Sequence, residues 1–251
     1  MQQAINDIFR RLFFTLNEFT ANFVTDPGTN WGLSIILFTL LFNLILFPLN
    51  NRAMQSSRKM SMIQPELQKI QARYKNDPAK LQAAQQKLMK DNKVSMWGGC
   101  LPMLIQWPLF IALFGLFRQL ATEGSLNYSF AGPLVPNLGA VNNIPLTVLV
   151  VITMILSTRL TQKANEKNMD EKARQQAKSM NTMNYVMAAM IGWFTWSSPA
   201  ALGLYWVTGN IFRIVQQLIL NAVRKEEDYV IIPADIPEEP TTRRRNKVIR
   251  K

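Results

Sequence analysis

The chain has 251 residues, 48% of them hydrophobic, and its 28 Lys and Arg against 16 Asp and Glu give a formal net charge of +12. It contains no histidine and one cysteine, Cys100. This composition excludes a Ser-His-Asp or Cys-His catalytic set, an internal disulfide, and a zinc site built from histidine and cysteine. The basic balance is compatible with nucleic-acid binding, but the long uncharged stretches described below argue against DNA as a partner.

Residues 1–30 are predicted to form an amphipathic helix on the extracytoplasmic side of a membrane. Their polar face includes Asp7, Arg10 and Glu18, and the apolar residues at helical spacing are Ile5, Ile8, Phe9, Leu12, Phe13, Leu16 and Phe23. Such a helix suits the membrane interface, and packing of the same helix on a bundle explains the pattern equally well. Residues 1–26 lack a continuous apolar core, so we expect no cleavable signal peptide.

Five apolar stretches are predicted to cross the membrane. A bilayer core about 30 Å thick needs roughly 20 apolar residues in a helix that rises ~1.5 Å per residue. The uncharged stretch 179–212 is too long for one ordinary span, and Ser197-Ser198-Pro199 offers a break because proline is tolerated at a helix start. The predicted spans are residues 31–49, 97–117, 144–160, 179–197 and 200–221.

The basic residues predict the orientation of these spans. Segment 50–96 holds ten Lys and Arg against three acidic residues, whereas segment 118–143 holds one of each. The positive-inside rule therefore places 50–96, 161–178 and 222–251 in the cytoplasm, and 118–143 and the N-terminus outside. We expect an all-α polytopic membrane protein with five transmembrane helices, a cytoplasmic helical hairpin and an N-terminal amphipathic interfacial helix.

The hairpin is predicted within residues 50–96. Asp77 and Pro78 suit the cap and first turn of its second helix, and Pro65 is expected to bend its first helix. The seam residues, spaced three and four apart, are Met60, Ile63, Leu67, Ile70 and Tyr74. A solvated basic loop is the alternative. The tail, 222–251, is predicted to be a flexible basic segment suited to anionic lipid or ribosomal RNA, unless it only retains topology.

Polar side chains inside the predicted spans indicate a candidate groove. Helix rise places Asn43, Gln106 and Arg213 at a similar depth, roughly 17–20 Å below the outer surface. Groups at that depth need partners or water, so the sequence predicts a hydrated, positively biased groove that is open to the cytoplasm and closed outside. Its residues are Thr39, Asn43, Gln106, Trp206, Asn210, Arg213 and Gln217. The alternative is that these groups only bond one another between helices.

Methionines in the fourth span suggest a second, apolar contact surface. Met183, Met187 and Met190 share one stripe, and flexible thioethers suit contact with varied apolar substrates, although core packing explains the same pattern. The spans contain no acidic residue and no internal repeat is visible, which weighs against the alternative of a small-solute transporter.

Four stretches resemble the YidC family of membrane protein insertases. They are WGLSII at 31–36, KMSMIQPELQKIQARYKND at 59–77, GGCLPMLIQWPLFIAL at 98–113 and GLYWVTGNIFRIVQQ at 203–217. The resemblance covers about residues 5–225, is closest to the short five-span type of Gram-positive bacteria, and implies the bacterial plasma membrane as location.

This resemblance implies a non-enzymatic insertase and chaperone that uses no nucleotide, cofactor or metal. Its groove would receive a hydrophilic segment of a nascent membrane protein while the apolar segment enters the lipid, alone or beside the Sec translocon. The hairpin and tail would meet the ribosome or targeting factors. The family usually carries an arginine, thought to attract acidic substrate residues, where this chain has Asn43. We predict that Arg213 supplies the positive charge instead.

Overall fold

The protein is helical throughout the part of the chain that the computed structural model describes, which comprises residues 2–94, 101–166, 171–223 and 232–233. This confirms the predicted all-α class. The helices are α1 (Gln2–Ala21), α2 (Pro27–Ile45), α3 (Phe47–Met62), α4 (Gln64–Arg73), α5 (Pro78–Asp91), α6 (Leu101–Thr122), α7 (Ile144–Glu166), α8 (Glu171–Trp196) and α9 (Ala200–Val223). A short 3-10 helix, Gly132–Leu134, lies between α6 and α7.

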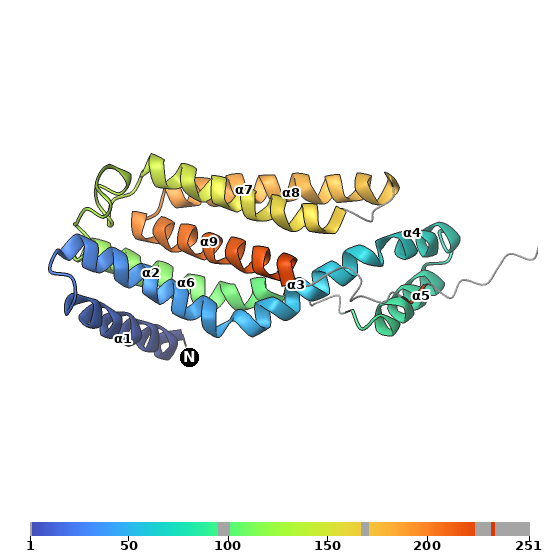
Figure 1. The fold of residues 1–251 in the computed structure, drawn as a ribbon, viewed down its shortest axis with the longest axis horizontal. Helices are drawn as coiled ribbons and strands as arrows, with labels where there is room; N and C mark the ends of the chain where they lie inside the picture. Colours follow the sequence, from blue (N-terminus) through green and yellow to red (C-terminus); the bar gives the residue numbers. More distant parts are fainter. Residues whose placement is uncertain (1, 95–100, 167–170, 224–231, 234–251) are drawn as a thin grey trace, which may run out of the picture.

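Six of these helices form an elongated bundle, and α3 leads out of it to α4 and α5 (Figure 1). In the bundle α9 is central, because it packs against α2, α6, α7 and α8. Helix α1 packs on α2 and α6 at the edge. The interior of the bundle can therefore be followed along α9.

The apolar core fills one end of the bundle. Its fully buried side chains include Phe13, Phe38 and Phe117 from three different helices. Leu126 and Leu138, from the loop between α6 and α7, are buried in the same cluster. The backbone of this loop also accepts hydrogen bonds from the start of α9, where the Ala201 N–H donates to the Leu138 carbonyl at 2.8 Å. This end of the bundle is therefore closed by apolar packing.

Helix α1 runs antiparallel to α2 along most of its length. At one end the Asn17 amide donates to the Ser34 hydroxyl at 3.1 Å, and at the other the rings of Phe9 and Phe42 stack with centroids 5.0 Å apart. Figure 1 shows the two helices side by side. From the sequence, residues 1–30 are expected on the extracytoplasmic side, and packing on the bundle is left open. In the structure α1 packs along α2, because α2 offers polar and aromatic partners to the buried face of α1.

Local sequence signals explain where several helices begin. The Asp26 carboxylate accepts a hydrogen bond from the Thr29 N–H at 2.7 Å at the start of α2. Asp77 does the same for the Lys80 N–H at 3.1 Å at the start of α5. Pro65 lies in the first turn of α4, and the helical stretch that begins at Phe47 is divided at Ile63 into α3 and α4. Helices α4 and α5 pack together through Ile63, Leu67, Ile70, Leu88, Met89 and Val94.

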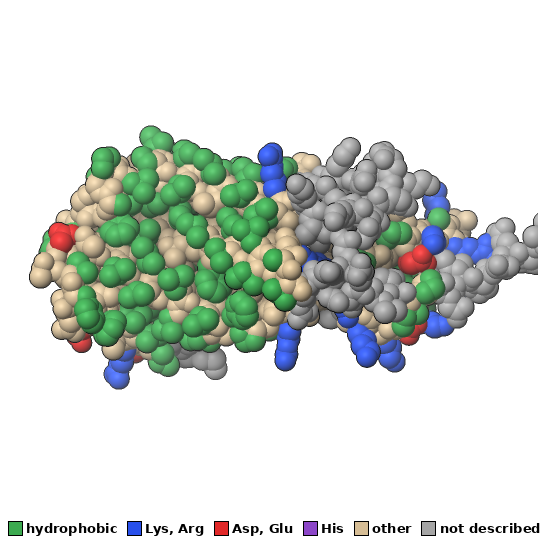
Figure 2. Space-filling view, viewed as in Figure 1, with side chains coloured by type: hydrophobic (Ala, Val, Ile, Leu, Met, Phe, Trp, Pro, Cys, Tyr) green, Lys and Arg blue, Asp and Glu red, His purple; other side chains and the backbone are tan. Residues whose placement is uncertain are grey.

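The surface of the bundle is strongly apolar. Helix α7 exposes Ile144, Val148, Ile152 and Leu156, which are spaced four apart and 47–65% exposed. Figure 2 shows hydrophobic side chains spread over the bundle, with Lys and Arg gathered toward the end that carries α3 to α5. Exposed apolar surface of this extent is typical of a membrane or partner contact. Pro27–Ile45 and Ile144–Gln162 are long and apolar enough to cross a membrane, by length and composition.

Candidate functional site

The buried face of α9 changes character along the helix. Its buried positions are apolar or aromatic in the first turns, from Ala200 to Tyr205 and at Val207. Beyond Val207 the buried positions are Asn210, Gln216 and Gln217, which are all amides. The helix thus runs from the closed apolar end of the bundle into a polar interior toward α3. We call the surfaces of α2, α6, α7 and α9 around these amides the polar seam.

On the α2 side of the polar seam lie Thr39 and Asn43. The Thr39 hydroxyl is fully buried and donates to the Ile35 carbonyl at 2.7 Å, while the Asn43 amide donates to the Thr39 carbonyl at 2.8 Å. A Cβ placed on Gly209 would lie 3.9 Å from both Asn43 Nδ2 and Thr39 Cγ2. Gly209 therefore faces α2 with ordinary van der Waals space, and Asn43 keeps its amide oxygen available.

On the α6 side, Gln106 connects two residues of α9. Its Nε2 donates to the Tyr205 hydroxyl, and its Oε1 accepts a hydrogen bond from Arg213 Nη2 at 3.4 Å. Arg213 is exposed, whereas Tyr205 is buried. The guanidinium is therefore held at the mouth of the polar seam, with its other donors available to a ligand. The sequence analysis did not identify Tyr205, because an aromatic residue in an apolar run carries no polar signal.

On the α7 side, Asn210 is paired with Thr153. The buried Asn210 Nδ2 donates to Thr153 Oγ1 at 3.2 Å, and that hydroxyl lies 2.8 Å from the Leu149 carbonyl of its own helix. Asn210 thus bonds between helices, as the alternative interpretation expected for such groups. The sequence analysis missed Thr153, since a lone threonine in an apolar span is common.

The most buried amides of the polar seam are Gln216 and Gln217. The Gln217 Nε2 donates to the Asn221 side chain at 2.8 Å. Gln216 is 2% exposed, and neither of its amide atoms has a hydrogen-bond partner among the described residues. It lies seven residues after Gly209, so it shares the helix face that meets α2. Its orphaned amide is the least satisfied group of the site.

The remaining predicted residues lie apart from these amides. The Trp206 ring packs against Phe110 and Phe194, with centroids 5.3 and 5.9 Å away, so it belongs to an aromatic cluster of α6, α8 and α9. Met183 and Met190 are each 63% exposed on the outer surface of α8, beside Trp193 at 67%. Met187 is half-buried. The methionine stripe is therefore turned largely outward.

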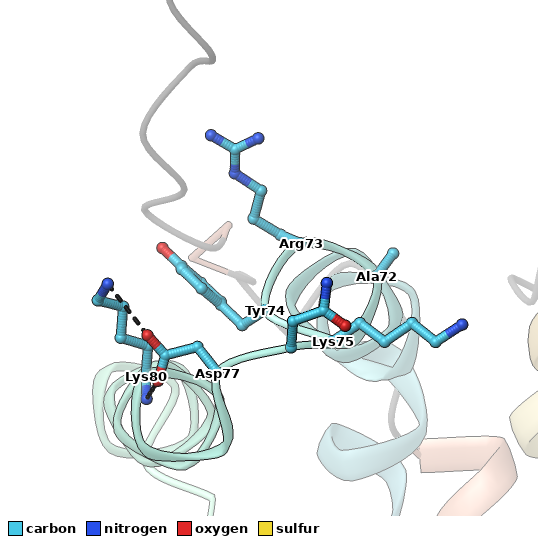
Figure 3. A pocket seen from close by; sticks show the side chains of 7 residues that line it. Ala72, Arg73, Tyr74, Lys75, Asp77 and Lys80 are labelled. Atoms are coloured by element: carbon cyan, nitrogen blue, oxygen red, sulfur yellow. Dashed lines mark hydrogen bonds and ion pairs between the residues drawn. The ribbon is translucent and has the colours of Figure 1, made fainter.

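A separate pocket of about 390 Å³ lies at the turn between α4 and α5 (Figure 3). Its lining residues are Ala72, Arg73, Tyr74, Lys75, Asn76, Asp77 and Lys80. Asp77 forms an ion pair with Lys80 at 3.0 Å. The hydrogen bond from the Lys80 backbone N–H is the main cause that lowers the pKa of Asp77. The pocket lies in the hairpin of α4 and α5, outside the polar seam.

Comparisons with known proteins agree with this architecture. Residues 22–227 match the family model of the 60Kd inner membrane protein. A relative from Clostridium tetani named membrane protein insertase YidC is 34% identical over 222 residues, which cover 88% of this chain and 96% of the relative. A relative of the same name from Oceanobacillus iheyensis is 38% identical over 200 residues, 76% of this chain and 74% of the relative.

A solved structure has the same fold. It is a crystal structure described as an active YidC insertase with the first transmembrane domain resolved, and it superposes with a TM-score of 0.61 at 25% identity. The match covers 84% of this chain and 45% of that chain.

Proposed function

This chain belongs to the YidC family of membrane protein insertases, and we propose that it inserts nascent membrane proteins through the polar seam. A short hydrophilic segment of the substrate enters the seam from the cytoplasm, and its apolar segment passes into the lipid beside it. The step lowers the cost of bringing peptide groups into hydrocarbon, where each unpaired group costs several kcal/mol. No nucleotide, cofactor, metal or catalytic residue is required.

The single observation that carries this proposal is the change from apolar to amide side chains on the buried face of α9, which ends at the orphaned amide of Gln216. A buried amide without a partner is costly, and water is the partner available in a polar, roomy site. The Nε2 atom of Gln162 on α7 is likewise buried and has no partner in the described part of the chain. We infer that water enters between α9 and its neighbours from the cytoplasmic end.

The apolar core stops this water short of the outer surface. Phe38, Phe117 and Leu202 are fully buried at the end of the bundle next to the loop between α6 and α7. A substrate segment that follows the amides is therefore held partway across the membrane. We propose that it then leaves sideways over apolar surface such as Met183, Met187, Met190 and Trp193 on α8.

Arg213 supplies the positive charge of the groove in this proposal. Its bond to Gln106, which is in turn fixed by Tyr205, holds the guanidinium at the entrance of the polar seam. An acidic substrate residue is attracted there, since a guanidinium presents several donors suited to a carboxylate. Thr39, Asn43, Asn210 and Gln217 form the walls.

We further propose five spans in the bacterial plasma membrane, formed by α2, α6, α7, α8 and α9, with the hairpin and the C-terminal tail in the cytoplasm. The basic surface of α4 and α5 and the basic tail suit polyanionic partners such as the ribosome and membrane lipid. We also propose that the protein acts as a chaperone for membrane proteins and cooperates with the Sec translocon.

Reconstitution tests the proposed function. The purified protein in liposomes, given a small single-span substrate, is expected to protect the inserted substrate from external protease. Gln216→Leu, which keeps the size and removes the amide, is expected to reduce insertion severalfold. Gln119→Leu, the same change on an exposed residue at the far end of α6, is the matched control and keeps full activity. Solute flux without substrate protection would instead identify a transporter.

A further inference from the structure

The turn that ends α5 holds a buried carboxamide bonded to a segment 140 residues later in the chain. Asn92 is 6% exposed; its Nδ2 donates to the Ile232 carbonyl at 2.9 Å and its Oδ1 accepts from the Ile232 N–H at 2.8 Å. Nδ2 also donates to the Leu88 carbonyl at 2.9 Å. Both hydrogens of the amide and its oxygen are thus used.

The two hydrogen bonds between Asn92 and Ile232 involve only the backbone of Ile232. One carboxamide bonded to both the N–H and the C=O of a single residue reproduces the paired bonds of an antiparallel strand. Ile232 is 47% exposed, and both of its hydrogen bonds to Asn92 are made by its backbone. Pro233 follows directly and restricts Ile232 to extended conformations, which keeps its N–H and C=O in a geometry suited to such pairing.

The turn around Asn92 is itself well fixed. The Val94 N–H donates to the Met89 carbonyl at 2.8 Å and the Lys93 N–H donates to the Lys90 carbonyl at 3.0 Å. Lys93 has a positive φ of 53°, so these bonds form the Schellman motif that closes many helices. Val94 is buried in the core of the hairpin. Asn92 is therefore presented in one orientation before any segment binds.

The pairing limits the distance between the hairpin and the bundle, because the chain between α9 and Ile232 is short. Eight residues lie between Val223, the last residue of α9, and Ile232, so the two Cα atoms are at most about 30 Å apart when the chain is extended. While Ile232 is bound, the end of α5 is held within that distance of the end of α9.

We propose that Asn92 is a docking site for the backbone of the chain's own C-terminal segment at Ile232, which clasps the hairpin of α4 and α5 to the end of the last bundle helix.

Distance measurements between two spin labels on the full chain in lipid nanodiscs test the clasp. With Cys100→Ser as background, cysteines at Gln82 on α5 and at Asp235, three residues after Ile232, carry the labels. A narrow distance distribution is expected for this protein. Asn92→Ala, which removes both bonds to Ile232, and Ile232→Pro, which removes the N–H that donates to Asn92, are expected to broaden it.

Two matched variants separate the clasp from general effects. Ile232→Ala keeps the backbone N–H and C=O and is expected to keep the narrow distribution. Asn76→Ala makes the same change as Asn92→Ala on an exposed hairpin residue and is expected to do likewise. A broad distribution in the unmodified protein overturns the proposal. So does broadening by Asn92→Ala without broadening by Ile232→Pro, because the effect would then come from the lost bond to Leu88.

Discussion

Asn43 occupies the position in α2 where the family resemblance implies an arginine, and its amide bonds to the Thr39 carbonyl one turn earlier. The cation that we propose for the same role is Arg213 on α9, which lies across the polar seam and bonds to Gln106 of α6. In our proposal Arg213 takes over the positive charge, because both positions belong to helices that line the same interior.

Replacing Arg213 with alanine tests this exchange. We expect insertion of a substrate with an acidic N-terminal segment to fall about tenfold, because a hydrogen bond to a charged group contributes on the order of 1.5–3 kcal/mol. Insertion of the same substrate with a neutral segment is expected to change little. The measurement is protease protection in liposomes. Arg118→Ala, which removes an exposed arginine at the other end of α6, is the control, and equal losses for both substrates would contradict the role of Arg213.

At the scale of the helix, the residues that determine where a helix begins act locally, through hydrogen bonds and backbone geometry. Asp77 begins α5 because its carboxylate accepts the Lys80 N–H, which is one of the donors that a helix start leaves unpaired. Pro65 acts in the same local way, by opening α4. In contrast, the face of α9 that becomes polar is defined by its neighbours: Gly209 meets α2, Gln106 of α6 bonds Arg213, and Thr153 of α7 bonds Asn210.

The cap at Asp77 predicts a pH dependence of α5. The hydrogen bond from the Lys80 N–H lowers the pKa of Asp77, so the folded hairpin favours the carboxylate. The stabilisation is therefore present above the unfolded pKa of about 3.9 and is lost as the pH falls through the lower pKa of the folded state. The protection of the first amides of α5 against hydrogen exchange, measured relative to the intrinsic exchange rate at each pH, is expected to fall in that acidic range.

Asp77→Asn provides the comparison for this cap. An asparagine keeps an oxygen that accepts the Lys80 N–H and does not titrate, so the protection factors at the start of α5 should no longer fall at acid pH. The carboxylate of Asp26 begins α2 by an equivalent bond and is unchanged in this variant, so exchange at the start of α2 is an internal reference. An unchanged acid response in Asp77→Asn would assign it to another group.

At the scale of the whole molecule, α1 takes the second of the two positions that the sequence left open, packed on α2 and α6 of the bundle. Its buried face contacts α2 at Asn17, which bonds to Ser34, and at Phe9, which stacks on Phe42. The N-terminal end of α1 consequently lies alongside the C-terminal part of α2. An interfacial helix would instead lie across the end of the bundle with its whole polar face in contact with water and headgroups.

Cysteine labelling from outside the membrane distinguishes the two positions of α1. With Cys100→Ser as background, Asn22→Cys lies in the turn before α2 and is expected to react with a membrane-impermeant maleimide added outside. Ile8→Cys, on the exposed side of α1 and next to Phe9, which stacks on Phe42, is expected to remain unreacted at the same time, because α1 carries it to the C-terminal part of α2. Equal reaction at both positions would favour the interfacial helix.

The sequence by itself determined the all-helical class, the family, and the residue types available for a groove without catalysis. Apolar length, helical periodicity and capping residues are local properties, so they can be read without knowing what packs against what. Only the tertiary structure decided which polar groups meet. It joined Gln106 to Tyr205 and Arg213, turned Asn210 to Thr153, left Gln216 unpaired, set Trp206 among aromatic rings and laid α1 along α2. These outcomes depend on the rotation of each helix about its axis and on its partner, which are settled by the packing of all the helices together.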